Sequence, residues 1–284
     1  MLQSLTPQYP LTETELADKY WARNFVILDD TDYRILLINT SAYHGTAEEY
    51  MHGRISDRTS QAIEQELDSM GHRNLNIAIC HHHPVKFGSF DNQDNSEIRG
   101  AEKLLSILDD GPYGDWVFLH GHRHFPDILY AQGGARSPII FSAGSFSATL
   151  HDEISSRTNN QFYIIDLEID PDAGTGVQAT FEAWDWIPNV GIQTPNSKNA
   201  GLPNVGGFGN RSGGIEMASQ IAEFYDSADE RFIEWDELCS AIPQIRYLMP
   251  RDLRVCLRSL RETHDFKIHT DEDSGQIAQL GKKK

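Results

Sequence analysis

Two histidine-rich motifs are the part of this sequence whose residue types could do chemistry: CHHHP at residues 80–84 and GHRH at residues 121–124. Each directly follows a short apolar run that predicts a buried strand. In layered α/β folds, ligand groups gather at the carboxyl ends of strands, so two such ends can converge on one site. We therefore predict that the side chains of His82, His122 and His124 lie close together. Imidazole is a ligand of Mn²⁺, Fe and Zn²⁺, so the pattern indicates metal chemistry.

The spacing inside the second motif carries a further expectation. If its backbone is extended, His122 and His124 point to the same side, about 6–7 Å apart. Each imidazole could then reach a different ion of a metal pair whose members lie about 3.5–4 Å apart. Gly121, which has no Cβ, would let the backbone approach the site closely.

The elements that must position these motifs alternate between strands and helices. Apolar runs predict strands at 32–39, 75–80, 116–119, 139–142, 162–169 and 180–186. Ser56 is a predicted N-cap for a helix that ends before Gly71. A second amphipathic helix is indicated by Ala101, Leu104, Leu105 and Leu108. This order predicts a layered α/β architecture.

Composition divides the chain into three predicted parts: residues 1–188, a Gly-, Asn- and Pro-rich linker or loop at 189–214, and a tail at 215–284. In the tail, helices are predicted at 215–225, 235–242 and from Pro250, followed by a hairpin over 266–280 that turns at residues 273–275. Three helices and a hairpin resemble a winged helix. The third helix carries an apolar stripe (Leu253, Cys256, Leu257 and Leu260) and a basic stripe (Arg251, Arg254, Arg258 and Arg261).

The charge balance limits the partners of the chain. The 284 residues carry a formal net charge of −18, and 39% of them are hydrophobic, which is ordinary for a soluble globular protein. Residues 1–188 carry 12 basic and 28 acidic side chains. Such a surface repels polyphosphate at long range, so a phosphoester substrate would need local cations such as metal ions. Three widely spaced cysteines, with no predicted signal peptide or membrane span, predict a cytoplasmic protein.

The two motifs together resemble those of the calcineurin-like metallophosphoesterases, which have His-x-Pro after one strand and Gly-His-x-His after the next. Segments 36–40, 53–56 and 142–145 are also similar to that family, and the resemblance covers roughly residues 25–187. It implies a sandwich of two β-sheets flanked by helices, of which this chain would hold the second half. It also implies hydrolysis of a phosphomonoester or phosphodiester by two divalent ions, which could be Mn, Fe or Zn.

The resemblance also implies roles for individual histidines. His82 and His122 would be ligands of one metal ion, and His124 would be a ligand of the other. His81 and His83 flank a ligand, so they would either face the substrate in catalysis or support a ligand from behind. The family's Asp-x-His and Gly-Asn-His motifs are missing from this sequence, and no Gly-Asp precedes the first histidine motif. Conceivable substitutes for their carboxylates are Asp29, Asp30, Asp91, Asp94 and Asp152.

Other interpretations stay open beside the hydrolase. The histidine run could be a solvated loop, or Cys80 and the histidines could hold a structural zinc ion. The chain could also be a non-catalytic metal-binding subunit, or a binding module that acts through its tail. For the tail we expect a protein partner, which could be another copy of the chain, in preference to nucleic acid, because residues 215–284 carry 10 basic and 14 acidic side chains.

Overall fold

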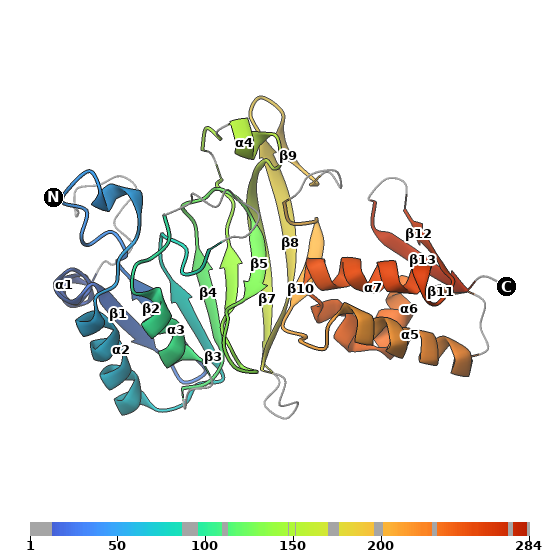
Figure 1. Cartoon of the computed structure of the whole chain (residues 1–284), viewed down its shortest axis with the longest axis horizontal. Helices are drawn as coiled ribbons and strands as arrows, with labels where there is room; N and C mark the ends of the chain where they lie inside the picture. The colour runs from blue at the N-terminus through green and yellow to red at the C-terminus, as the bar shows by residue number, and fades with distance from the viewer. Residues whose placement is uncertain are drawn as a thin grey trace. The chain divides into compact units, whose positions relative to one another are not determined.

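A computed structural model describes residues 13–86, 96–109, 113–146, 148–150, 152–169, 176–195, 201–228, 232–271 and 275–282. The chain forms two compact units. The first comprises Met1–Phe125 and Leu129–Ala143, and the second comprises Pro126–Ile128 and Gly144–Lys284. The architecture is mixed α/β with several sheets (Figure 1).

The first unit is built on a six-stranded sheet of order β1-β2-β3-β4-β6-β5. Its strands are β1 (Phe25–Asp29), β2 (Tyr33–Ile38), β3 (Leu75–Ile79), β4 (Trp116–His120), β5 (Asp127–Tyr130) and β6 (Ile139–Ser142). The pairs β2–β3, β3–β4 and β4–β6 are parallel, and β1 runs antiparallel to β2. The predicted strands β2, β3, β4 and β6 are thus confirmed, and β1 and β5 are strands that the sequence analysis did not predict.

Helices cover this sheet, and the apolar periodicity predicts the second and third of them but not the first. They are α1 (Thr14–Arg23), α2 (Asp57–Met70) and α3 (Ala101–Leu108), with a short 3-10 turn η2 at Glu49–Met51. Ser56 caps α2 by accepting a hydrogen bond from the backbone N–H of Thr59, as predicted. Figure 1 shows α2 and α3 side by side against the sheet. Fully buried side chains such as Ile63 of α2 and Leu104 of α3 fill the space between helices and strands.

The second unit begins with a sheet of order β10-β8-β7, with β9 also paired to β8. Its elements are α4 (Asp152–Ser155), β7 (Asn160–Ile169), β8 (Val177–Ile187), β9 (Gly191–Gln193) and β10 (Val205–Phe208). Part of the predicted linker at 189–214 is therefore strand. The reason is close packing: a Cβ on Gly207 would lie 1.9 Å from the carbonyl oxygen of Arg246, and one on Gly206 would lie 2.6 Å from the Phe181 ring. Here glycine permits contact instead of flexibility.

The tail forms three helices and a three-stranded sheet of order β11-β13-β12. Its elements are α5 (Gly214–Ala228), β11 (Phe232–Glu234), α6 (Trp235–Ala241), η3 (Pro243–Tyr247), α7 (Pro250–Glu262), β12 (Phe266–Thr270) and β13 (Ile277–Lys282). The predicted helices and hairpin are confirmed, although Asp273 and Ser274 of the predicted turn lie outside the described residues. Cys256 and Leu260 of the apolar stripe are fully buried against α5 and its neighbours. None of the helices in the described part of the chain has the length and apolarity of a membrane-spanning helix.

A buried arginine at the start of β2 forms hydrogen bonds with residues of β1 and β3 and with the C-cap of α2. The Arg34 side chain has no exposed surface. Its Nε donates to Asp29 Oδ1 at 2.9 Å, and its guanidinium also reaches Asn76 Oδ1 and the Gly71 carbonyl. A buried charge of this kind is tolerated because each of these acceptors offsets part of the lost hydration.

We predict that Arg34→Ala lowers the free energy of unfolding of the first unit by about 3 kcal/mol, because it leaves the buried Asn76 Oδ1 without this donor, removes one of the two arginines bonded to Asp29 and opens a cavity. Hydrogen exchange of the β2 and β3 amides measures this change. Arg58→Ala, at an exposed position of α2, is the control and should shift the same amides by less than about 0.5 kcal/mol. An equal effect of both variants would show that the Arg34 network contributes nothing specific.

Candidate metal site

Parallel pairing brings the two histidine motifs to one edge of the six-stranded sheet. β3 and β4 pair in register up to Ile79 and Leu119, so the loops that follow them leave the sheet together. Two backbone hydrogen bonds continue the pairing beyond the strands: Cys80 N–H donates to Leu119, and Gly121 N–H donates to His81, each at 3.1 Å. The first motif is thereby held against the second.

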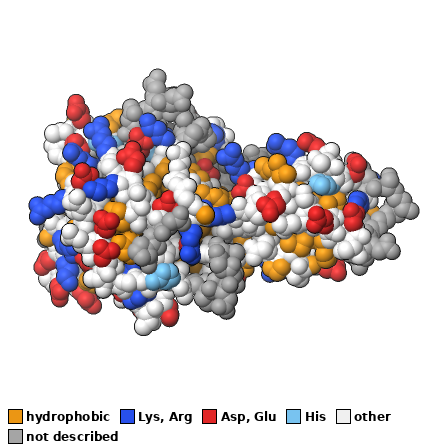
Figure 2. All heavy atoms as spheres, turned by 60° about the horizontal axis from the view of Figure 1, so that its bottom comes forward, with side chains coloured by type: hydrophobic (Ala, Val, Ile, Leu, Met, Phe, Trp, Pro, Cys, Tyr) orange, Lys and Arg blue, Asp and Glu red, His pale blue; other side chains and the backbone are white. Residues whose placement is uncertain are grey.

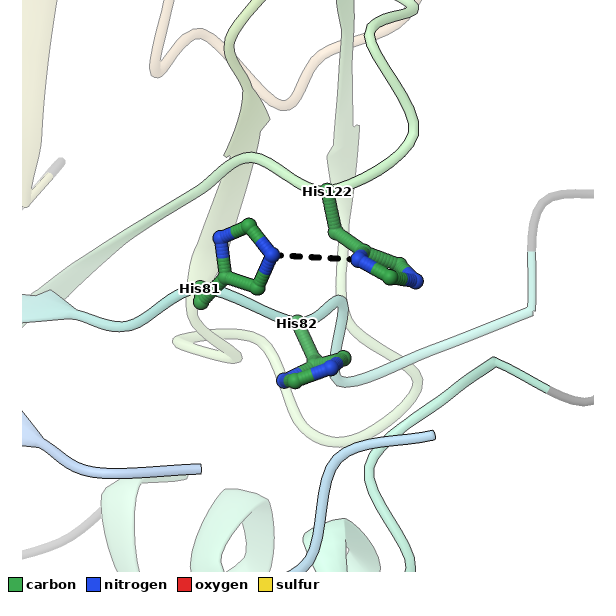
Figure 3. Close-up of side chains that lie close together, drawn as sticks. All are labelled: His81, His82 and His122. Carbon is green, nitrogen blue, oxygen red and sulfur yellow. Dashed lines mark hydrogen bonds between the residues drawn. The ribbon is translucent and has the colours of Figure 1, made fainter. Parts of the chain in front are cut away.

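Three imidazoles meet at this edge: His81 and His82 from the loop after β3, and His122 from the loop after β4 (Figure 3). One nitrogen atom from each of them lies within 4.8 Å of the others, so the three could together hold one metal ion. Ring centroids are 4.5 Å apart for His82 and His122, and 4.8 Å apart for His81 and His82. A hydrogen bond of 3.1 Å joins His122 Nδ1 to His81 Nε2.

His82 is held from three sides. Its Nδ1 lies 2.8 Å from the Thr40 hydroxyl, which leaves Nε2 as the nitrogen that can ligate an ion. The ring of His44 meets it edge-on at 5.4 Å between centroids. On a third side lies Gly53, where an added Cβ would come within 2.6 Å of the His82 Cβ. Thr40, His44 and Gly53, which lie outside the group of three, therefore help to set the orientation of this imidazole.

Burial keeps these imidazoles neutral. The pKa of His82 is lowered to about 3 and that of His122 to about 4, first by burial and then by the surrounding histidines, because two imidazolium charges would repel each other. The pKa of His81 is also lowered, first by burial and then by His124 and His44. Neutral imidazole is the form that binds metal, so protons compete weakly with an ion near neutral pH.

The second motif departs from the expected extended backbone. His122 and His124 have φ angles of +68° and +54°, so the chain turns at both residues and the two side chains do not alternate as in a strand. His124 lies outside the group of three, and His81 takes the third place in it. The expected role of Gly121 was also wrong, because the nearest atom to a Cβ at this position would be 4.0 Å away.

The two expected flanking residues differ in exposure. His81 is exposed, whereas His83 has no exposed surface and lies behind the group, with ring centroids 6.4 Å from His122 and 6.1 Å from His120. In this conformation the His83 side chain is shielded from solvent. Cys80 is outside the group of three as well, and its thiol donates to the His82 carbonyl, which disfavours a Cys–His zinc site.

Of the carboxylates considered as substitutes, Asp29 and Asp30 do not lie at this edge. Asp29 is bonded to Arg34 and Arg73 beside the start of β2, at the opposite end of the strands and thus about 15 Å or more from the histidines. Asp30 follows Asp29 directly, and Asp152 belongs to the second unit. Asp91 and Asp94 lie outside the described residues.

Four residues that support the histidines were missed by sequence reasoning: Thr40, His44, Gly53 and His120. Thr40 and Gly53 lie in segments that entered the family resemblance, but nothing in their types or spacing showed that they would touch His82. His120 precedes the GHRH motif directly and is buried, and burial lowers its pKa to about 3. The adjacency of His120 to the motif was the one signal that could have been used.

Comparison with known proteins gives two findings. A family model described as wHTH-Calcineurin_assc matches residues 206–262, which run from β10 to the end of α7. Among solved structures, a chain described as "Structure of PhoD" is similar with a TM-score of 0.39 and 11% sequence identity. That match covers 62% of this chain and 42% of the PhoD chain, so this chain spans less than half the length of that protein. No curated protein matches the sequence.

Proposed function

We propose that the histidine edge of the six-stranded sheet is the metal-binding part of a phosphoester-hydrolysing site, and that the chain is a hydrolase of the metallophosphoesterase type. The observation that carries this proposal is the group of three neutral imidazoles at the ends of adjacent parallel strands. The order and spacing of the two motifs resemble those of that family, and this resemblance supports phosphoester hydrolysis as the reaction.

In this proposal His81, His82 and His122 hold a divalent ion such as Mn, Fe or Zn. A bound ion of this kind polarises a phosphoryl oxygen and lowers the pKa of a water molecule. Thr40 orients His82, and buried His83 and His120 close the rear of the site to water. His81, which is exposed, is placed on the side from which a phosphomonoester or phosphodiester would approach.

Three neutral ligands are suited to a site with one metal ion and not to a site with two. A pair of divalent ions needs carboxylates that offset their mutual repulsion, and among the described residues none joins the histidine group. We therefore infer that the remaining ligands of a dinuclear site are supplied by another segment or chain. The same observation favours a second candidate function, a metal-binding subunit without hydrolytic activity of its own.

Metal binding is the first test. We expect one Zn²⁺ or Co²⁺ ion per chain in equilibrium dialysis, and we expect His82→Ala and His122→Ala each to weaken binding by about 100-fold or more, because only two of three ligands remain. His72→Ala, at an exposed histidine before the start of β3, is the matched control and should bind as the unchanged chain does. Equal binding by all four proteins would refute the site.

The hydrogen bond with Thr40 orients the His82 imidazole, so its loss should weaken metal binding. Thr40→Val keeps the shape of the side chain and removes the hydrogen bond to His82 Nδ1, so metal affinity should fall by about 10- to 100-fold, and Thr40→Ser should restore most of it. In the metal-free protein, imidazole ¹⁵N shifts should report a changed tautomer for His82 in Thr40→Val alone. Unchanged shifts and affinity would mean that the contact has no positioning role.

Catalysis is tested separately. We expect residues 1–284 with Mn²⁺ to hydrolyse an aryl phosphate only near the background rate. The reason is that, among the described residues, the three histidines have no carboxylate ligands beside them to hold a metal pair. Adding a segment that carries Asp-x-His and Gly-Asn-His motifs should raise turnover in a way that depends on His122. Strong turnover by the chain alone, abolished in His122→Ala, would show that the site is already complete.

A further inference from the structure

One face of α7 carries four arginines that are all exposed: Arg251, Arg254, Arg258 and Arg261. Their spacing of three, four and three residues places them on one side of the helix. The opposite side is anchored in the core of the second unit, where Cys256 and Leu260 have no exposed surface. The arginine face is therefore held in a fixed orientation and is directed away from that core.

These arginines lack the partners that surface arginines usually find. Across the described residues, none of the four forms an ion pair, although the chain has 42 acidic and 24 basic side chains. The half-buried carboxylate of Asp127 interacts electrostatically with Arg254 and Arg251: burial raises its pKa, and these two arginines partly oppose that rise. Neighbouring like charges on a helix repel each other. An anionic ligand would relieve this repulsion.

An apolar groove adjoins the arginine face inside the second unit. The cavity of about 500 Å³ is lined on the α7 side by Leu253, Arg254 and Leu257. Facing them are Val205 of β10, Trp235 of α6 and Ile277 of β13. Arg254 belongs both to the arginine face and to the groove, so the charged and apolar surfaces are continuous. Val205 is 50% exposed and can receive an apolar side chain of a ligand.

The backbone of β10 adds a third feature to this groove. Within the described strands, β10 has a sheet neighbour on one side only, β8. An edge strand presents N–H and C=O groups that an extended peptide can pair with. Gly207 is already packed against the carbonyl oxygen of Arg246, so a peptide would meet this edge at its exposed residue, Val205.

The charges favour a polypeptide over nucleic acid as the ligand. Duplex DNA offers phosphates to the arginines but no flexible apolar groups to the groove. The tail at 215–284 has more acidic than basic side chains, and the sequence Asp271-Glu272-Asp273 follows β12, where a winged helix would bring its hairpin toward a phosphate backbone. Figure 2 shows basic side chains scattered among acidic ones on the face it draws, without the continuous basic surface typical of DNA-binding proteins.

We propose that the arginine face of α7 and the adjoining groove bind an acidic polypeptide segment that carries apolar anchor residues. Its carboxylates pair with Arg254 and Arg258, and its apolar side chains enter the groove beside Leu257 and Val205. This inference does not rest on the metal site, so His122→Ala should bind the segment as well as the unchanged chain does.

The test uses the full chain and fluorescence anisotropy with a panel of fluorescein-labelled 12-residue peptides. Each peptide carries Glu residues and two Leu residues in a different register, and each has a counterpart with Gln in place of Glu. We expect binding that weakens with salt, and we expect the Gln counterparts to bind at least about 10-fold more weakly, because each exposed ion pair contributes about two- to five-fold.

Variants separate the two surfaces. Arg254→Glu with Arg258→Glu should weaken peptide binding by at least about 10-fold, whereas Arg58→Glu with Lys103→Glu, a matched charge reversal on α2 and α3, should leave it unchanged. Val205→Ser should weaken binding of the Leu-containing peptides and spare versions with Ser in place of Leu. Thermal unfolding verifies that each variant is folded.

Three outcomes would overturn the proposal. The first is that no peptide of the panel binds, and the second is that binding survives in the Arg254 and Arg258 double variant. The third uses a 20-base-pair DNA duplex in the same assay: if the duplex binds more tightly than every peptide and is lost in the double variant, α7 is a nucleic-acid surface instead.

Discussion

The candidate site depends on the parallel pairing of β3 with β4. Parallel strands that pair in register end at the same edge, and here the pairing continues for two more hydrogen bonds after the strands have ended. Those bonds, from Cys80 to Leu119 and from Gly121 to His81, hold two loops that would otherwise separate. These bonds thereby bring the imidazoles of His82 and His122, which are 40 positions apart in the chain, within contact distance.

The burial of the histidines is the second constraint, because it disfavours their protonated, charged form. Collecting His82, His83, His120 and His122 around one sheet edge is costly if they are protonated, because each charge would lose hydration and repel the others. The depressed pKa values of His82, His120 and His122 express this cost. A cluster that must be neutral is also a cluster ready to ligate a cation. The arrangement that suits metal binding is thus the same one that allows the histidines to be packed together.

The second unit shows how close packing and exposed charge can be combined in one small module. Gly207 lets β10 pack closely against η3, and the core around Cys256 and Leu260 fixes the direction of α7. Since that helix is anchored by its apolar side, its arginines remain exposed to solvent. Residues 206–262, which match the family model described as wHTH-Calcineurin_assc, include both the packed β10 and the arginine-bearing helix.

Local patterns in the sequence determined most elements of the fold. Apolar runs predicted β2, β3, β4, β6, β7 and β8, and a cap with helical periodicity predicted α2, because these features depend on neighbours in the chain. The sequence also placed His82 and His122 correctly, because each follows closely after a predicted strand. Three features depended on tertiary structure alone. The left-handed turns at His122 and His124 replaced His124 by His81 in the group, the contacts of Thr40 and Gly53 oriented His82, and packing turned a glycine-rich segment into β10. The last two result from contacts between residues distant in sequence, which residue type and spacing do not show.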